Sequence, residues 1–176
     1  MIGLALAGGG VKGSYEAGAY NALKKCHVHF DGVTGTSIGA FNAAMIAAKK
    51  DKELTDFWFN VNVASILGIN NNSNNKIVSS LKVIFNRGFE VDGLEKVLKE
   101  YDVEKSVRKS NIDFGLCTFK INNQEAIELF KKQISDGKLE EYIIASCFLP
   151  IFVAHLACLN NAGSFKLEAV GTLPNS

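Results

Sequence analysis

The sequence predicts an α/β fold built on a mostly parallel sheet. Two short apolar stretches, Ile2–Ala7 and Phe30–Thr36, each run into a glycine-rich turn, and each turn is followed by apolar residues at helical spacing. Strands that alternate with helices in this way form parallel sheets with right-handed crossovers. No proline precedes Pro150, which suits uninterrupted helices and strands.

The length of the chain indicates how many domains it forms, and its net charge indicates whether it binds nucleic acid. The chain has 176 residues, 47% hydrophobic and 21% charged, and we expect a single globular domain over residues 1–176. Lys and Arg total 19 and Asp and Glu 18, so the net charge is +1. Nucleic-acid-binding proteins usually show a basic excess or a basic face, so we expect no nucleic-acid partner. The sequence does not define an oligomeric state.

The other elements follow in order along the chain. Helices are expected where apolar residues recur at helical spacing or where a capping residue precedes them. Asp92 is the expected N-cap of the helix 93–100. The predicted helices are 14–25, 38–49, 51–60, 76–85, 93–100 and 139–146. Two further strands are predicted at 112–119 and 125–130, joined by a turn at Asn122-Asn123.

No targeting or membrane-spanning segment is expected. The apolar N-terminus has no basic residues before it, which favours a strand over a signal peptide. A second uncharged stretch, 142–159, is interrupted by Ser146, Pro150 and His155, which favours a buried segment over a membrane span. We therefore expect a cytoplasmic protein.

The cysteines and histidines predict neither a metal site nor a disulfide framework. None of the four cysteines forms a C-x-x-C pair. Cys26, His27 and His29 lie close together, but no fourth ligand follows at a matching spacing. We expect no metal and no cofactor.

The first glycine motif is Gly8-Gly9-Gly10-Val11-Lys12-Gly13, between the first predicted strand and a helix. Glycines there allow a tight turn and bring backbone N–H groups close to an anion, and the following helix N-terminus adds partial positive charge. Both a dinucleotide pyrophosphate and a reaction oxyanion fit this pattern. The dinucleotide interpretation requires an acidic residue at the end of the second strand, and Asp31 has the right distance in sequence but stands at the start of that strand.

The second motif, Gly35-Thr36-Ser37-Ile38-Gly39, has the pattern G-x-S-x-G between a strand and a helix. This is the context of a nucleophile elbow, in which a sharp turn projects the serine hydroxyl and the flanking glycines leave room for crossing backbone. The alternative is that Gly35 and Gly39 are packing glycines and that Ser37 is an N-cap.

Together the two motifs resemble those of the patatin-like phospholipases. The resemblance rests on residues 4–13 and 35–40 and extends through Ala145–Phe152, which is similar to the family's A-S-x-x-x-P-x-F segment. It implies a three-layer α/β/α domain, a Ser37 nucleophile and an oxyanion hole in the first loop. It also implies a lipid or acyl ester substrate, with membrane contact limited to the surface. The residues assigned to the oxyanion hole are Gly8, Gly9, Gly10, Val11, Lys12 and Gly13, and those assigned to the elbow around Ser37 are Gly35, Thr36, Ile38 and Gly39.

The resemblance ends near residue 152, and residues 153–176 diverge. The family places a catalytic aspartate in a D-G-G or D-G-A motif after this segment, whereas residues 151–176 contain no aspartate, and Glu168 is their only carboxylate side chain. Glu168, or His155 oriented by Asp113 or Asp136, are the possible substitutes. We expect a domain incomplete at its C-terminal part, with impaired hydrolysis or with lipid or partner binding alone.

Overall fold

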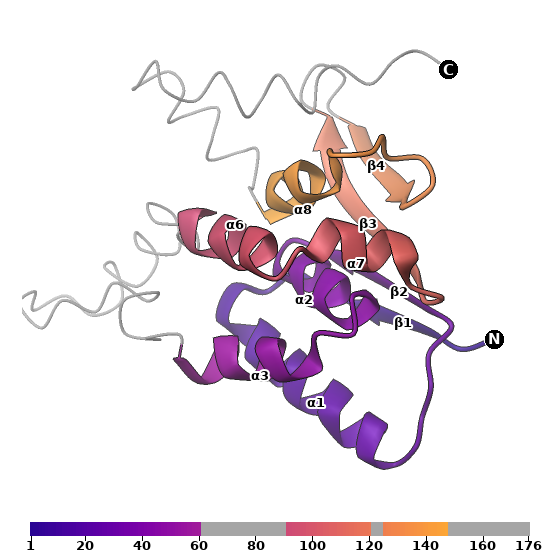
Figure 1. The fold of residues 1–176 in the computed structure, drawn as a ribbon, viewed down its shortest axis with the longest axis vertical. Helices are drawn as coiled ribbons and strands as arrows, with labels where there is room; N and C mark the ends of the chain where they lie inside the picture. The colour runs from indigo at the N-terminus through magenta and orange to yellow at the C-terminus, as the bar shows by residue number, and fades with distance from the viewer. Residues whose placement is uncertain (61–90, 121–124, 148–176) are drawn as a thin grey trace, which may run out of the picture.

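The computed structural model describes residues 1–60, 91–120 and 125–147, which form a sheet with helices packed on it (Figure 1). The strands are β1 (Gly3–Leu6), β2 (Gly32–Thr36), β3 (Asp113–Lys120) and β4 (Glu125–Phe130). The helices are a 3-10 turn η1 (Gly10–Lys12), α1 (Gly13–Lys25), α2 (Ile38–Ala47), α3 (Asp51–Asn60), α6 (Val91–Glu100), α7 (Val103–Lys109) and α8 (Leu139–Cys147).

The sheet has the order β1-β2-β3-β4, with β1, β2 and β3 parallel and β4 antiparallel to β3. Gly3 pairs with Gly32, and Gly32 pairs with Asp113, so these three strands begin at the same edge. Their carboxyl ends meet at the opposite edge, where both glycine motifs follow. The predicted α/β class with a mostly parallel sheet is confirmed.

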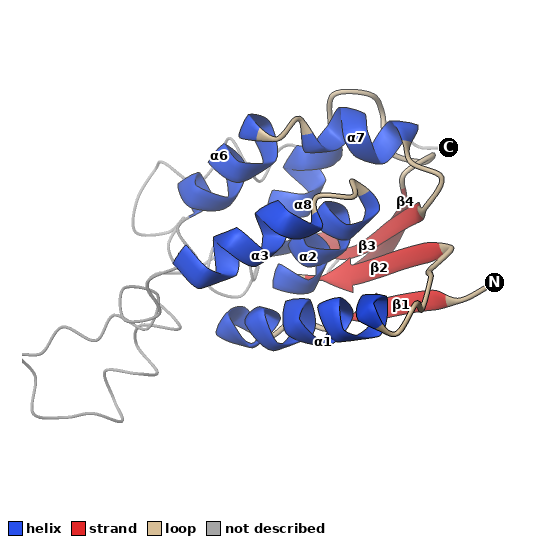
Figure 2. Cartoon of the chain, turned by 60° about the horizontal axis from the view of Figure 1, so that its bottom comes forward, coloured by secondary structure: helices blue, strands red, loops and turns tan. Residues whose placement is uncertain are grey.

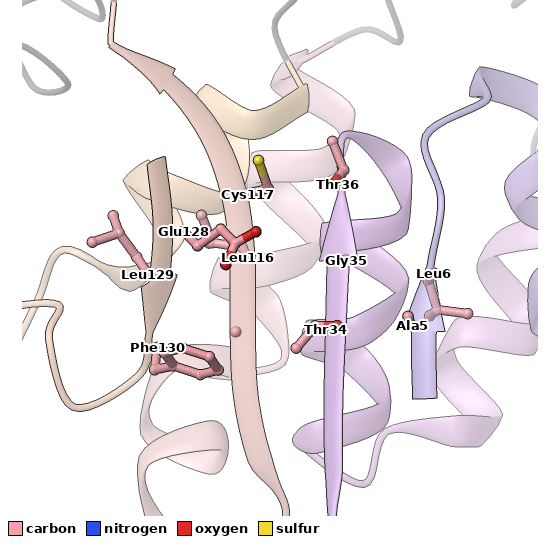
Figure 3. Close-up of a pocket in the computed structure, with 11 residues that line it drawn as sticks. Ala5, Leu6, Thr34, Gly35, Thr36, Leu116, Cys117, Glu128, Leu129 and Phe130 are labelled. Atoms are coloured by element: carbon pink, nitrogen blue, oxygen red, sulfur yellow. The ribbon is translucent and has the colours of Figure 1, made fainter. Parts of the chain in front are cut away.

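The two faces of the sheet differ. Helices cover one face of the sheet (Figure 2). Val33, Phe114 and Leu116 of the strands that α2 contacts are buried. The other face carries a shallow pocket lined in part by Ala5, Thr34, Cys117, Glu128 and Phe130 (Figure 3). The described residues thus supply the sheet and one helical layer, in agreement with the predicted three-layer α/β/α architecture.

Helix α2 is the centre of the core. All ten of its residues are buried, and it contacts β1, β2 and β3 as well as helices α1, α3, α7 and α8. Its small and apolar residues make it hydrophobic on every side, which is typical of a helix enclosed by other elements. The start of α2, directly after Ser37, is therefore held from all directions.

Several predicted boundaries shift. Helix α2 ends at Ala47 rather than residue 49, because Lys49 adopts a left-handed conformation with φ 59°. Asp92 lies inside α6, so its assignment as an N-cap is wrong. Helix α7 was not among the predicted elements. The predicted helix 76–85, the predicted turn at Asn122-Asn123 and residues 153–176, which were predicted to diverge, lie outside the described residues.

The first residues of the uncharged stretch 142–159, up to Cys147, belong to α8. Tyr142, Ile143 and Ile144 are buried there, as predicted for a core segment. Within the described ranges, no helix combines the length and the apolar character needed to cross a bilayer.

Candidate active site

Ser37 lies in the sharp turn between the carboxyl end of β2 and the start of α2. Its backbone has φ 56° and ψ −131°, a conformation that residues other than glycine rarely adopt and that costs of order 1–3 kcal/mol. Ser37 occupies the N-cap position of α2, but its side chain makes no capping hydrogen bond. Ser37 thus has the position of an N-cap, as in the alternative interpretation, but its hydroxyl does not cap the helix.

The glycines on either side of Ser37 are required by backbone crossing. A Cβ on Gly39 would lie 2.5 Å from the carbonyl oxygen of Leu6 and 2.6 Å from that of Ala7. A Cβ on Gly35 would overlap the carbonyl group of Gly39. Residues 35–39, the elbow from here on, therefore have the steric requirement predicted for a nucleophile turn.

Residues 8–13, the glycine loop, leave β1 at the same edge of the sheet and approach Ser37 directly. A Cβ on Gly8 would lie 3.1 Å from Ser37 Cβ and 3.9 Å from Ser37 Oγ. Gly10 has φ +57° and starts the 3-10 turn that leads into α1. None of the described residues accepts a hydrogen bond from the backbone N–H groups of Gly8 to Val11. Lys12 is exposed.

A buried polar group, Asn42, ties the glycine loop to the elbow helix. Asn42 Nδ2 donates to the carbonyl of Gly13 at 2.9 Å and to Glu16 at 3.0 Å, and Asn42 Oδ1 accepts from Trp58 Nε1 at 3.0 Å. Burial raises the pKa of Glu16, while its hydrogen bonds to Asn42 and to the backbone of Ala7 act in the opposite direction. Asn42 was not identified from the sequence, where it stands among alanines in a helix.

The last residues of α8 contact the backbone of Ser37, which sequence reasoning also missed. Ser146 Oγ accepts a hydrogen bond from Ser37 N–H, and Cys147 Sγ donates to the Ser37 carbonyl. The sequence signal that points to this region is the A-S-x-x-x-P-x-F segment, in which Ser146 is the serine. The structure thus places the start of the glycine loop, the elbow and the start of that segment around Ser37.

Comparison with known proteins identifies the family. The family model described as patatin-like phospholipase matches residues 4–163. The chain belongs to the patatin-like phospholipase family. Family membership supports a lipid hydrolase function.

Curated relatives share short stretches with this patatin-like domain. One is lysophospholipase nte1 of Aspergillus terreus, 44% identical over 50 residues, which cover 28% of this chain and 3% of that protein. Another is patatin-like phospholipase domain-containing protein 7 of Mus musculus, 43% identical over 54 residues, which cover 31% of this chain and 4% of that protein. The matched stretches thus span a small part of the length of these relatives.

Three aspartates considered from the sequence lie away from Ser37. Asp31 stands just before β2 and accepts a hydrogen bond from the backbone N–H of Ile2, at the edge opposite the glycine loop. Its carboxylate therefore cannot bind a ribose beside that loop. The dinucleotide interpretation requires an acidic residue there, and Asp31 does not supply it. Asp113 begins β3 at this same far edge, near Lys131 Nζ. Asp136 is 96% exposed and pairs with Arg108.

The other substitutes for a catalytic base, His155 and Glu168, lie outside the described residues. In the parts of the chain that are described, no group of three or more His, Cys, Asp or Glu side chains could hold a metal ion. The site is built from one serine hydroxyl, backbone N–H groups and a helix N-terminus.

Proposed function

We propose that this patatin-like domain is a serine lipid acyl hydrolase in which Ser37 is the nucleophile. Ser37 Oγ would bond to the ester carbonyl carbon, and the carbonyl electrons would move to its oxygen. Collapse of this tetrahedral intermediate would release the alcohol and leave an acyl group on Ser37, which water would remove as a fatty acid.

The N–H groups of Gly9 and Gly10, with Val11, are the proposed oxyanion donors. The observation that carries this proposal is that the glycine loop begins beside Ser37, where a Cβ on Gly8 would lie 3.9 Å from Ser37 Oγ, and that its N–H groups have no described acceptor. Ser37 N–H is already bonded to Ser146 Oγ, which leaves the loop as the source of donors. One donor of this kind contributes about 3 kcal/mol to lowering the barrier.

Removal of the Ser37 Oγ proton is the slow event in this reaction. The proton that Ser37 Oγ loses as it attacks would pass to water, and water would supply the proton that leaves with the alcohol. A serine without an adjacent base is a poor nucleophile at neutral pH. Residues 151–176 contain no aspartate, and Asp113 and Asp136 lie elsewhere in the fold. We therefore propose that turnover is impaired relative to family members that carry the aspartate.

The test uses a fluorophosphonate probe, which reacts with activated serines, together with hydrolysis of a lysophospholipid. We expect covalent labelling at Ser37, low turnover, and loss of both in Ser37→Ala. Absence of labelling in a folded wild-type chain would show that Ser37 is not an activated nucleophile.

A second candidate function, a lipid- or partner-binding domain without catalysis, is favoured by the absence of that aspartate. It predicts that the chain binds phospholipid vesicles equally well with and without Ser37, and that neither form hydrolyses ester. Ester turnover that disappears in Ser37→Ala would exclude this candidate.

A further inference from the structure

Both backbone polar groups of Ser37 are held by two consecutive residues at the end of α8. Ser37 N–H donates to Ser146 Oγ at 2.9 Å, and Ser146 Oγ donates in turn to the carbonyl of Cys117, in the middle of β3, at 2.6 Å. Cys147 Sγ lies 3.2 Å from the carbonyl oxygen of Ser37. Ser146 and Cys147, the clamp from here on, therefore connect the elbow to the neighbouring strand.

The two halves of the clamp are not equivalent. The Ser37 carbonyl also accepts from the N–H groups of Ala40 and Phe41, as expected at the start of a helix. Ser37 N–H precedes the helix, and among the described residues Ser146 is its acceptor. Ser146 is 7% exposed, so water has little access to replace it. Burial raises the pKa of the Cys147 thiol to about 12, which keeps it a neutral donor.

We propose that Ser146 is a positioning residue for the nucleophile, a proposal that rests on the proposed role of Ser37. The hydrogen bonds of its hydroxyl fix the plane of the Thr36–Ser37 peptide and so direct Ser37 Oγ toward the glycine loop. They also occupy Ser37 N–H, a group that could otherwise compete for the oxyanion. Cys147 strengthens the hold on the other side of Ser37.

Helix α8 is fixed at its far end, which makes it a suitable support for the clamp. Glu104 of α7 accepts hydrogen bonds from the N–H groups of Gly137 at 2.7 Å and Leu139 at 3.1 Å, and so caps the start of α8. Arg108 donates to the carbonyls of Lys131, Ile134 and Ser135 in the connection that precedes α8. The hydroxyl of Ser146 is thus placed by contacts at both ends of a short helix.

The test compares Ser146→Ala with wild type by two measurements on the full chain. Hydrogen exchange of the Ser37 amide, followed by NMR, reports the hydrogen bond whether or not the chain is active. The second-order rate of fluorophosphonate labelling reports the position of Ser37 Oγ. We expect exchange about tenfold faster and labelling about tenfold slower in Ser146→Ala, the size of one lost hydrogen bond.

Ile143→Val is the matched control, because Ile143 is fully buried on the same helix and its side chain has no hydrogen-bonding group. It loosens the packing of α8 and should leave both rates within about twofold of wild type. If Ser146→Ala does not fold, Ser146→Cys replaces it, since a thiol is a weaker acceptor in nearly the same space. It should change both rates in the same direction by less.

The outcomes separate the clamp from the proposed function. A wild-type chain that does not react with the probe overturns the role of Ser37, and the exchange rates alone then decide whether Ser146 holds its amide. Unchanged exchange in Ser146→Ala overturns the clamp. Faster exchange with an unchanged labelling rate shows a contact that does not position the nucleophile, and overturns the proposal as well.

Discussion

The elbow and the glycine loop follow neighbouring parallel strands at the same edge of the sheet, and both are rich in glycine. In the elbow, Gly35 and Gly39 are enclosed by backbone atoms that a Cβ would strike. In the loop, Gly10 faces open space, and its positive φ is what favours glycine there. The elbow glycines and Gly10, which look alike in sequence, thus require glycine for different physical reasons.

This difference fits the chemistry proposed for each turn. A nucleophile must be held in one position, and the elbow is built against the buried helix α2. An oxyanion hole must present N–H groups that are not already bonded, and the loop from Gly8 to Val11 leaves such groups without a described acceptor. The elbow glycines therefore depend on packing, and Gly10 in the loop depends on backbone conformation; Gly13, at the end of the loop, is packed like the elbow glycines, because its Cβ would lie 2.6 Å from Trp58 Cζ2.

The largest effect is expected for Gly39→Ala, which tests whether the elbow depends on packing. Its Cβ would lie 2.5 Å from the Leu6 carbonyl oxygen, so β1 and α2 must separate. We expect the free energy of unfolding to fall by about 3 kcal/mol or more, measured by urea denaturation.

Gly18→Ala is the control for this substitution. Gly18 lies in α1, and a Cβ added there would have no neighbouring atom within 4 Å, so alanine should stabilise the helix by roughly 0.5–1 kcal/mol. Equal unfolding midpoints for the two variants would contradict the packing argument.

Asn42→Ala tests the connection between the two turns and should have the next largest effect. It removes hydrogen bonds to the Gly13 carbonyl and to Glu16 in a fully buried place. We expect a loss of about 2 kcal/mol in the free energy of unfolding, because buried polar groups lose their partner.

The matched control is Asn21→Ala, which removes a single hydrogen bond from α1 to Thr55 on α3. Its expected cost is about 1 kcal/mol, since this site is partly open to water. If the Asn42 variant costs no more than the Asn21 variant, the buried connection does not stabilise the site.

The bounds of a helix or strand can be predicted from the sequence where a local pattern of residues defines them. The strand 125–130 is found at its predicted bounds, because its pattern needs no distant partner to be recognised. Helix α7 has seven residues and only two buried apolar positions, Val103 and Val107, which is too short for a periodic signal. Helix α2 ends early at a left-handed Lys49, where the usual glycine signal is absent.

For the site, spacing predicts both turns but not what holds them. The elbow and the glycine loop are recognised because their residues are adjacent in sequence. Ser146 lies 109 positions from Ser37, and Asn42 lies 29 positions from Gly13, so their contacts depend on how the helices pack. Long-range polar partners of this kind leave no periodic pattern in a single sequence.

Gly10→Ala tests whether the loop depends on conformation. With no atom within 4 Å of the new Cβ, the cost should be only that of a left-handed alanine, about 1 kcal/mol. The labelling rate of Ser37 should fall as the loop N–H groups move, while Gly10→Asn, which tolerates this conformation better, should lie closer to wild type in both measurements. A cost as large as that of Gly39→Ala would remove the distinction between the two turns.

The smallest effect is expected for Glu16→Gln, which tests how the loop is held to α2. Because burial raises the pKa of Glu16 in the folded chain, the folded state binds its proton more tightly than the unfolded state does. The stability from Glu16 is therefore complete below the ordinary glutamate pKa, and it is lost as the pH rises through the raised folded value. Glutamine cannot titrate, so any hydrogen bond it loses gives an offset that does not depend on pH. The stability of wild type relative to Glu16→Gln, measured by urea unfolding, should thus decrease as the pH rises above the ordinary glutamate pKa of about 4, whereas an increase would mean that the hydrogen bonds from Asn42 and Ala7 outweigh burial.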